Sequence, residues 1–215
     1  MMRLTSLSLF SLSLVCVALA AVSANAAEDD KGWTALTDGK SFDGWKINES
    51  EKSWSIKDGA FVAKGGRSHL FYVGDEKPFE NFILNLKVMT KNNSNGGVYF
   101  HTKYQKEGWP KNGFECQVNN SYNSDPRKTA SVYAVKDVME APAGDDEFFD
   151  YTIEVKDKTA KLYINGKLVN EYTEPEGTEA GKDFTRVFDK GTFALQAHDP
   201  GSTVYYKDIR VKRLP

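Results

Sequence analysis

Short runs of alternating hydrophobic and polar residues recur along most of the chain, and Gly, Asn, Asp or Pro bounds nearly every run. Alternation with a period of two predicts β-strands that bury one face. No window after residue 26 keeps apolar residues at i, i+3, i+4 and i+7 for three turns, so helices are not favoured. The predicted strands are 54–56, 60–63, 82–90, 97–104, 114–119, 131–135, 149–156, 159–164, 167–172, 191–197 and 203–210.

One hairpin is marked by the stretch KLYINGKLVNEY, in which Asn165-Gly166 lies between two alternating runs. This dipeptide accepts the positive φ angles of a type I′ turn. Asp157-Lys158 predicts a second tight turn, so residues 151–172 form a three-stranded antiparallel meander. A domain buries its sheets by packing them against other layers, and about eleven strands without a crossover helix can do so only as a sandwich or a barrel. We predict an all-β fold, a jelly-roll β-sandwich of two curved antiparallel sheets.

The first residues have the pattern of a secretory signal peptide. Arg3 supplies a positive charge, residues 7–22 form a mostly apolar run without charge, and Ala24-Asn25-Ala26 is an A-x-A cleavage site. The run is short for a membrane-spanning helix. The sequence predicts a signal peptide over 1–26, cleavage near Ala26, and a secreted or periplasmic protein with no membrane span in the mature chain.

The size and charge of the mature chain limit the number of domains and the kinds of partner that can be expected. Residues 27–215 suffice for one domain with a substantial core. Without Arg3, 27 basic residues stand against 30 acidic ones, so nothing favours nucleic acid or an anionic membrane as partner. Only Cys116 remains after cleavage, which excludes an intramolecular disulfide and predicts a buried thiol.

On several predicted strands, one face is apolar and the other carries Gln, His, Tyr or Glu rather than the Thr, Ser and Lys of an ordinary solvent-exposed face. Around Glu115 and Gln117 the intervening positions are Phe, Cys and Val, and the segment FALQAH repeats this arrangement with Gln196 and His198. Gln, His, Tyr and a lone Glu recognise hydroxyl groups or move protons. If these strands are neighbours, one sheet face collects Tyr99, His101, Glu115, Gln117, Tyr133, Gln196 and His198.

Taken singly, each candidate also has an ordinary structural explanation. Glu115 can be a surface carboxylate or part of a salt bridge, and His198 can cap a strand end before the turn at Asp199. The polar run 92–97, which contains Asn95, is most simply explained as a tight turn between two strands. Trp109 can be a platform on which a sugar stacks, or it can close the edge of the core.

Several catalytic signatures are missing from the sequence. There is no G-x-S-x-G elbow, no H-E-x-x-H, no Walker loop and no zinc spacing. The strand with Glu115 has Gln117 at the position where jelly-roll glycosidases often place a second carboxylate, so a double-displacement mechanism is unsupported there.

The ordered set of motifs resembles the 3-keto-disaccharide hydrolase family, whose members have a concanavalin A-like β-sandwich. The resemblance covers essentially the whole mature chain. Its motifs are W-x-x-L-x-D-G-K-x-x-D-G-W at 33–45, N-G-G-V-Y-F at 95–100, G-F-E-C-Q-V at 113–118, S-V-Y at 131–133, I-N-G at 164–166, G-T-F-A-L-Q-A-H at 191–198, and Y-K-D-I-R-V-K-R-L near the end.

The resemblance implies chemistry at a sugar ring activated by a ketone. A ketone at C3 makes the C2 proton acidic, so one base can start an elimination of the C1 substituent, with water adding afterwards. Glu115 is then expected to be the base or a metal ligand, and His198 the proton donor or a ligand. Gln117, Gln196, Tyr133 and Asn95 would orient hydroxyls or polarise the ketone. A divalent cation is compatible with this chemistry, but two ligand candidates do not make a site.

Two positions depart from the family pattern. His101 stands where many relatives have Arg, and Phe149-Asp150 stands where a Trp-Asn pair is common. The leading hypothesis is an exported enzyme that cleaves 3-keto-glycosides or 3-keto-disaccharides, as hydrolase or lyase. The alternatives are a non-catalytic carbohydrate-binding module that uses Trp109 and tyrosines as platforms, and a structural surface domain. The sequence leaves the sugar, the aglycone, the metal requirement and the oligomeric state open.

Overall fold

The computed structural model describes residues 31–215. The chain divides into two units, residues 1–33 and 34–215, and the fold described below is that of the second. The predicted signal peptide and its cleavage site lie outside the described residues. Residues 31–215 contain no helix with the length and hydropathy of a membrane span.

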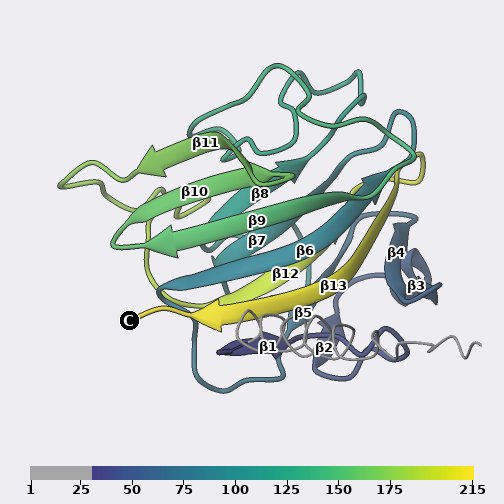
Figure 1. Ribbon diagram of the computed structural model, residues 1–215, viewed down its shortest axis with the longest axis horizontal. Coiled ribbons are helices and arrows are strands. Elements are labelled where there is room, and N and C mark those ends of the chain that lie inside the picture. Colours follow the sequence, from purple (N-terminus) through teal and green to yellow (C-terminus); the bar gives the residue numbers. More distant parts are fainter. Residues whose placement is uncertain (1–30) are drawn as a thin grey trace, which may run out of the picture. The chain divides into compact units, whose positions relative to one another are not determined.

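Two antiparallel β-sheets form the domain, as the alternating pattern predicted (Figure 1). The larger sheet has the strand order β11-β10-β9-β6-β13-β4-β3, and β1 also pairs with β13. The smaller sheet has the order β2-β5-β12-β7-β8 and lies behind the larger one in Figure 1. One 3-10 turn, Glu51–Ser53, interrupts the strands. The strands are β1 (Trp33–Ala35), β2 (Trp45–Ile47), β3 (Trp54–Lys57), β4 (Ala60–Lys64), β5 (Ser68–Tyr72), β6 (Phe82–Thr90), β7 (Gly96–Thr102), β8 (Phe114–Val118), β9 (Phe149–Lys156), β10 (Thr159–Ile164), β11 (Lys167–Thr173), β12 (Thr192–Ala197) and β13 (Thr203–Arg213).

The predicted meander is formed by β9, β10 and β11, and both of its turns have the required backbone. Asn165 and Gly166 have φ angles of 49° and 76°, and Asp157 and Lys158 have 48° and 63°. Two consecutive positive φ angles define the type I′ turn, whose twist matches that of the flanking strands. Local sequence therefore determines this part of the larger sheet.

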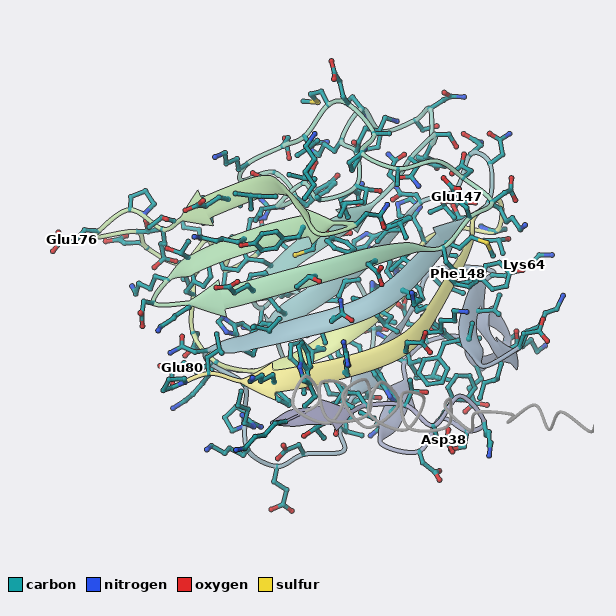
Figure 2. All side chains as sticks on the ribbon, viewed as in Figure 1. Asp38, Lys64, Glu80, Glu147, Phe148 and Glu176 are labelled. Atoms are coloured by element: carbon teal, nitrogen blue, oxygen red, sulfur yellow. The ribbon has the colours of Figure 1, made fainter. Side chains whose placement is uncertain are left out.

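The space between the sheets is filled by large apolar side chains. Phe82 of β6 is fully buried and contacts Phe100 of β7 and Phe193 of β12, which joins the two layers. The side chain of Cys116 is also buried in this core, as predicted. Charged side chains lie outside, as Figure 2 shows for Glu147 and Glu176 in loops of the larger sheet.

The outer faces of the two sheets differ in their exposure to solvent. In β6 and β9 buried residues alternate with half-buried ones, so the outer face of the larger sheet is partly exposed to solvent. In β7 every residue is buried, and in β12 all but the first are. The outer face of the smaller sheet is therefore covered by loops, although it carries polar residues.

Two details of the predicted strands are wrong. Residues 131–135 form a turn, in which Val132 makes only isolated bridges to Cys116 and Lys136, because Ala130 and Ala134 have left-handed φ angles of 71° and 55°. The strands β1, β2 and β5 were not predicted. All five residues of β5 are buried, so no alternation marks this strand in the sequence.

Candidate functional site

A pocket of about 310 Å³ opens on the outer face of the smaller sheet. Its floor comes from β7, β8 and β12, and its walls come from loops. Eight of the nine candidate residues that the sequence indicated line it. The lining residues are Asn95, Tyr99, Trp109, Pro110, Gly113, Glu115, Gln117, Asp125, Tyr133, Phe184, Arg186, Gln196 and His198.

The register of the three floor strands brings the polar side chains together. Tyr99 of β7 lies opposite Glu115 of β8, and Gly97 lies opposite Gln117. Because Gly97 has no side chain, the Glu115 carboxylate occupies the space above it: a Cβ on Gly97 would lie 2.7 Å from Glu115 Oε1. Gln196 of β12 can therefore reach across β7, and its Nε2 donates hydrogen bonds to Glu115 Oε1 and to Tyr99 Oη, each at 2.8 Å.

The electrostatics of Glu115 suit a general base. The carboxylate reaches the pocket but is enclosed by protein on its other sides, and burial raises its pKa from 4.5 to about 7. Hydrogen bonds from Tyr99 and Gln196 and the positive charge of Arg186 lower this pKa and oppose the larger effect of burial, while Asp125 raises it slightly. A base with a pKa near neutrality can both accept and release a proton at physiological pH.

Several buried amide atoms at the pocket have no partner among the described residues. They are Oδ1 of Asn95, both Oε1 and Nε2 of Gln117, and Oε1 of Gln196. Buried polar atoms in folded proteins nearly always have hydrogen-bond partners, so unpaired atoms that line a pocket indicate groups reserved for a ligand or for water. Two acceptors and one complete amide suit a ligand rich in hydroxyl groups.

His198 follows β12 and lies at the edge of the pocket beside Trp109, with ring centroids 5.3 Å apart and planes inclined by 34°. Its Nδ1 is 2.7 Å from Asp199 Oδ2. Although burial opposes it, hydrogen bonds from His198, Ser202 and Gly201 lower the pKa of Asp199. An ionised Asp199 accepts the Nδ1 proton, which leaves Nε2 of His198 for a ligand. This is the pairing by which a carboxylate orients an imidazole.

Tyr133 reaches the pocket from the turn that replaces the predicted strand. Its backbone N–H donates to the carbonyl oxygen of Glu115 at 2.9 Å, which fixes the turn to β8. Its hydroxyl donates to Asp125 Oδ2 at 3.1 Å, and the guanidinium of Arg127 lies over its ring at 4.6 Å. Burial raises the pKa of Tyr133, with a further contribution from Asp125, so the phenol keeps its proton.

His101 is the one indicated residue that does not line the pocket. The alternation of β7 breaks at this position because His101 has a left-handed φ of 54°. Its ring consequently turns into the core, where it contacts Phe82 and Phe188, and its Nε2 donates to the carbonyl of Glu80 at 2.8 Å. The prediction that His101 shares a face with Tyr99 is therefore wrong.

A second histidine lies below the pocket wall. His69 of β5 pairs in register with Gln196, and its ring contacts those of Tyr99 and Trp109. Burial, with a smaller effect of Arg67, lowers the pKa of His69 to about 3, so this imidazole is neutral. Nothing in the alternation of β5 indicated it.

Sequence reasoning missed four side chains that bring a charge or an aromatic ring to the site. Asp199 directly follows His198, and a carboxylate next to a candidate histidine is a signal that could have found it. Asp125, Phe184 and Arg186 come from loops, where no periodicity indicates which way a side chain points. Within the part of the chain described, no three His, Cys, Asp or Glu side chains cluster as metal ligands would.

The fold places the chain in the class of β-sandwiches built from two antiparallel sheets. A provisionally assigned glycosyl hydrolase from Parabacteroides distasonis has a similar fold, with a TM-score of 0.72, 24% identity, and coverage of 88% of this chain and 97% of that one. A carbohydrate-binding module of Bacillus subtilis, CBM66, has a TM-score of 0.57 at 15% identity, covering 79% of this chain and 95% of the module. A Bacillus subtilis protein with a galectin-like fold gives 0.59 at 12% identity, covering 84% and 94%.

The family follows from the sequence itself. Residues 32–212 match the model of the 3-keto-alpha-glucoside-1,2-lyase-like domain, so the chain belongs to this family. This confirms the family expected from the ordered motifs. A comparison with curated proteins gave no match.

Proposed function

We propose that the protein is an enzyme that cleaves the glycosidic bond of 3-keto-glycosides or 3-keto-disaccharides by elimination across C1 and C2, with or without hydration of the product. Glu115 removes the C2 proton, which the neighbouring C3 ketone makes acidic. The electron pair of the C2–H bond moves toward the ketone and forms an enolate. When this electron pair returns from the enolate, it forms the C1–C2 double bond and the C1–O bond breaks. His198 gives the departing oxygen a proton. Hydration adds water across the new double bond.

The observation that carries this proposal is the environment of Glu115. It is a carboxylate with a pKa of about 7, held by Gln196 in a pocket where four buried amide atoms have no partner among the described residues. An elimination beside a ketone needs one base of this kind, whereas glycosidases that act through an oxocarbenium-like transition state use a pair of carboxylates. Asp125 is the other carboxylate of the pocket, and it is engaged by Arg127 and Tyr133.

The direct test compares 3-keto-glucosides with the corresponding ordinary glucosides, with and without a chelator. We expect release of the aglycone from the keto substrates alone, because only the ketone acidifies the C2 proton. The chelator arm shows whether a divalent cation takes part. Equal cleavage of both substrate sets would contradict the proposal.

A carbohydrate-binding module is the second candidate function. The observation that favours it is Trp109, whose ring lines the pocket wall as sugar-stacking platforms do. Binding of keto and ordinary sugars with similar affinity, measured by calorimetry and without turnover of either, would favour the module over the enzyme.

The pH dependence of turnover follows from the pKa of Glu115. The base must be ionised to accept the proton, so kcat/KM is expected to rise with pH through an apparent pKa of about 7 and to be low at pH 5. The measurement is the pH profile of aglycone release at low substrate concentration. A profile that is flat between pH 5 and 8 would contradict the assignment of Glu115 as the base.

Replacing Asp199 with asparagine is expected to slow cleavage by on the order of 10-fold or more, as part of the 10²–10⁴-fold that a general acid contributes. The amide can no longer accept the Nδ1 proton as a carboxylate does, so His198 loses its orientation. The loss should be larger with a poor leaving group, such as an alkyl glycoside, than with p-nitrophenol, which needs no proton. Equal losses with both would show that His198 is not the acid.

We also propose that the chain is exported to the periplasm or secreted after cleavage near Ala26, on the strength of the N-terminal pattern. Mass spectrometry of the intact protein recovered from the producing cells and their medium tests this. A mature chain that begins near Ala27 is expected, and a cell-associated chain that retains residues 1–26 would contradict it.

A further inference from the structure

Arg186 is a charged side chain of the pocket for which the alternation pattern gives no role. It lines the pocket together with Phe184, and its guanidinium lies 5.2 Å from the centroid of the Phe184 ring. Arg186 is half-buried. It therefore places a permanent positive charge in the same cavity as Glu115.

The backbone around Arg186 is held firmly against the strand that carries Glu115. The N–H of Thr185 donates to the carbonyl of Lys111 at 2.8 Å, and the N–H of Gly113 donates to the Thr185 hydroxyl at 3.0 Å. On the other side, the N–H of Phe188 donates to Glu174 Oε2 at 2.7 Å. Gly113 immediately precedes β8, so these bonds fix Arg186 relative to Glu115, two residues further along the chain.

The guanidinium of Arg186 has no hydrogen bond or ion pair with any residue of the described chain. The two other arginines near the pocket are paired: Arg127 with Asp125 at 3.2 Å and with Asp137 at 3.1 Å, and Arg67, whose guanidinium lies over the Trp109 ring, with Glu49 at 2.7 Å. The charge of Arg186 does act on Glu115, whose pKa it lowers against the effect of burial. A half-buried arginine with five donors and no protein acceptor is available to a ligand with negative charge.

We propose that Arg186 stabilises the negative charge that forms on the C3 oxygen of the sugar when Glu115 takes the C2 proton, an inference that rests on the proposed function. In this step the C2–H bond breaks, its proton forms a bond to the Glu115 carboxylate, and its electron pair enters the C2–C3 bond while the ketone oxygen becomes an oxyanion. The negative charge thus moves from Glu115 to the sugar. Arg186 and Glu115 line the same pocket, so the charge of Arg186 acts on a sugar bound there as well as on Glu115.

The neutral amides of the pocket cannot supply a positive charge to offset the negative charge that forms on the C3 oxygen. Gln117 and Gln196 can donate hydrogen bonds to a sugar oxygen, but they carry no net charge. A fixed charge directed at the atom where charge develops is one of the largest contributions to catalysis, because the protein needs no reorganisation during the reaction. Arg186 is therefore assigned to the transition state rather than to binding of the unreacted sugar.

The test isolates proton removal from bond cleavage. The 3-keto derivative of 1,5-anhydroglucitol has the ketone and the C2 proton but lacks the exocyclic leaving group at C1, so its C2 exchange with D₂O reports proton removal without release of an aglycone. Arg186→Gln is expected to slow this exchange on the order of 10²–10³-fold, as loss of one oxyanion donor does, with less than about a threefold change in the Kd of the analogue. Arg186→Lys should retain part of the rate.

Two further readouts separate this role from a structural one. Lys182→Gln removes a positive charge from the same segment at an exposed position, and it is expected to exchange at the wild-type rate. In Arg186→Gln the acidic limb of the exchange profile should move to higher pH, because Glu115 loses the positive charge that lowers its pKa. Both Arg186 variants are compared with wild type by circular dichroism and melting temperature.

Each outcome bears on a different claim. Exchange at the wild-type rate in Arg186→Gln, together with slower release of anionic aglycones only, would overturn the inference and assign Arg186 to the leaving group. A wild-type protein that binds the analogue without exchanging its proton would overturn the proposed function, and this inference with it.

Discussion

Glu115→Gln is expected to reduce the turnover of 3-keto-glucosides by about 10²–10⁴-fold, the range that general base catalysis contributes. Glutamine has nearly the same shape and can keep a hydrogen bond to Gln196, but it cannot accept the C2 proton. The measurement is aglycone release under single-turnover conditions, with binding of the substrate followed separately. Turnover near the wild-type rate would show that another group is the base.

The same substitution is expected to stabilise the folded protein, and more so at high pH. The folded-state pKa of Glu115 is about 7, above its usual value of 4.5. A raised pKa gives a stability contribution that is fully present below pH 4.5 and is lost as the pH rises through 7, when the buried carboxyl ionises. The total loss is about 3 kcal/mol, at about 1.4 kcal/mol per pKa unit.

Urea unfolding at pH 5 and pH 8.5 measures this effect. The stability advantage of Glu115→Gln over wild type should grow by roughly 2 to 3 kcal/mol between the two pH values. Glu147→Gln, at an exposed position in a loop, is the matched control and should show no such growth. A pH-independent difference between Glu115→Gln and wild type would mean that the carboxylate is not destabilised by burial.

Gly97→Ala is expected to cost on the order of 10²-fold in kcat/KM, since a displacement of about 1 Å in a catalytic group can have that effect. The added methyl group would lie 2.7 Å from Glu115 Oε1 and 3.2 Å from its Cγ, so the carboxylate must leave the position in which Oε1 accepts from Gln196. The backbone of β7 can accept alanine at this position. The folded structure should persist, which circular dichroism checks.

Gly66→Ala is the control for this substitution, because nothing lies within 4 Å of the methyl group it would add. It should leave kcat/KM unchanged. Gly97→Ala should also shift the apparent pKa of the pH profile, because Glu115 would lose its hydrogen bond from Gln196. Full activity with an unshifted profile in Gly97→Ala would show that the carboxylate does not act from the position above Gly97.

The floor of the site was predictable because strand geometry is regular. In β8 and β12, alternation places every second side chain on one face, so the sequence puts Glu115 and Gln117 on one face of their strand and Gln196 on the polar face of its own. The order β12-β7-β8 then makes these faces a common surface. The same rule failed at His101, where a left-handed φ turns the side chain to the other face. Such an irregularity depends on tertiary contacts and leaves no pattern in the sequence.

The walls of the site were largely unpredictable. Asp125 and Arg186 lie about 60 residues apart on separate loops, and their directions are set by contacts such as that between Thr185 and Lys111. Tyr133 was expected in a strand and reaches the pocket from a turn instead. Trp109 was foreseen only as one of two alternatives, since an aromatic residue in a loop can serve the core or a ligand equally well.

The division between a floor made of strands and walls made of loops has an evolutionary consequence. Substitutions in the segments around Trp109, Asp125 and Arg186 can alter which aglycone fits while the positions of Glu115 and Gln196 stay fixed by the sheet. Under the proposed function, the substrate range of this scaffold can change through its loops while the proton-abstracting group keeps its place on the sheet.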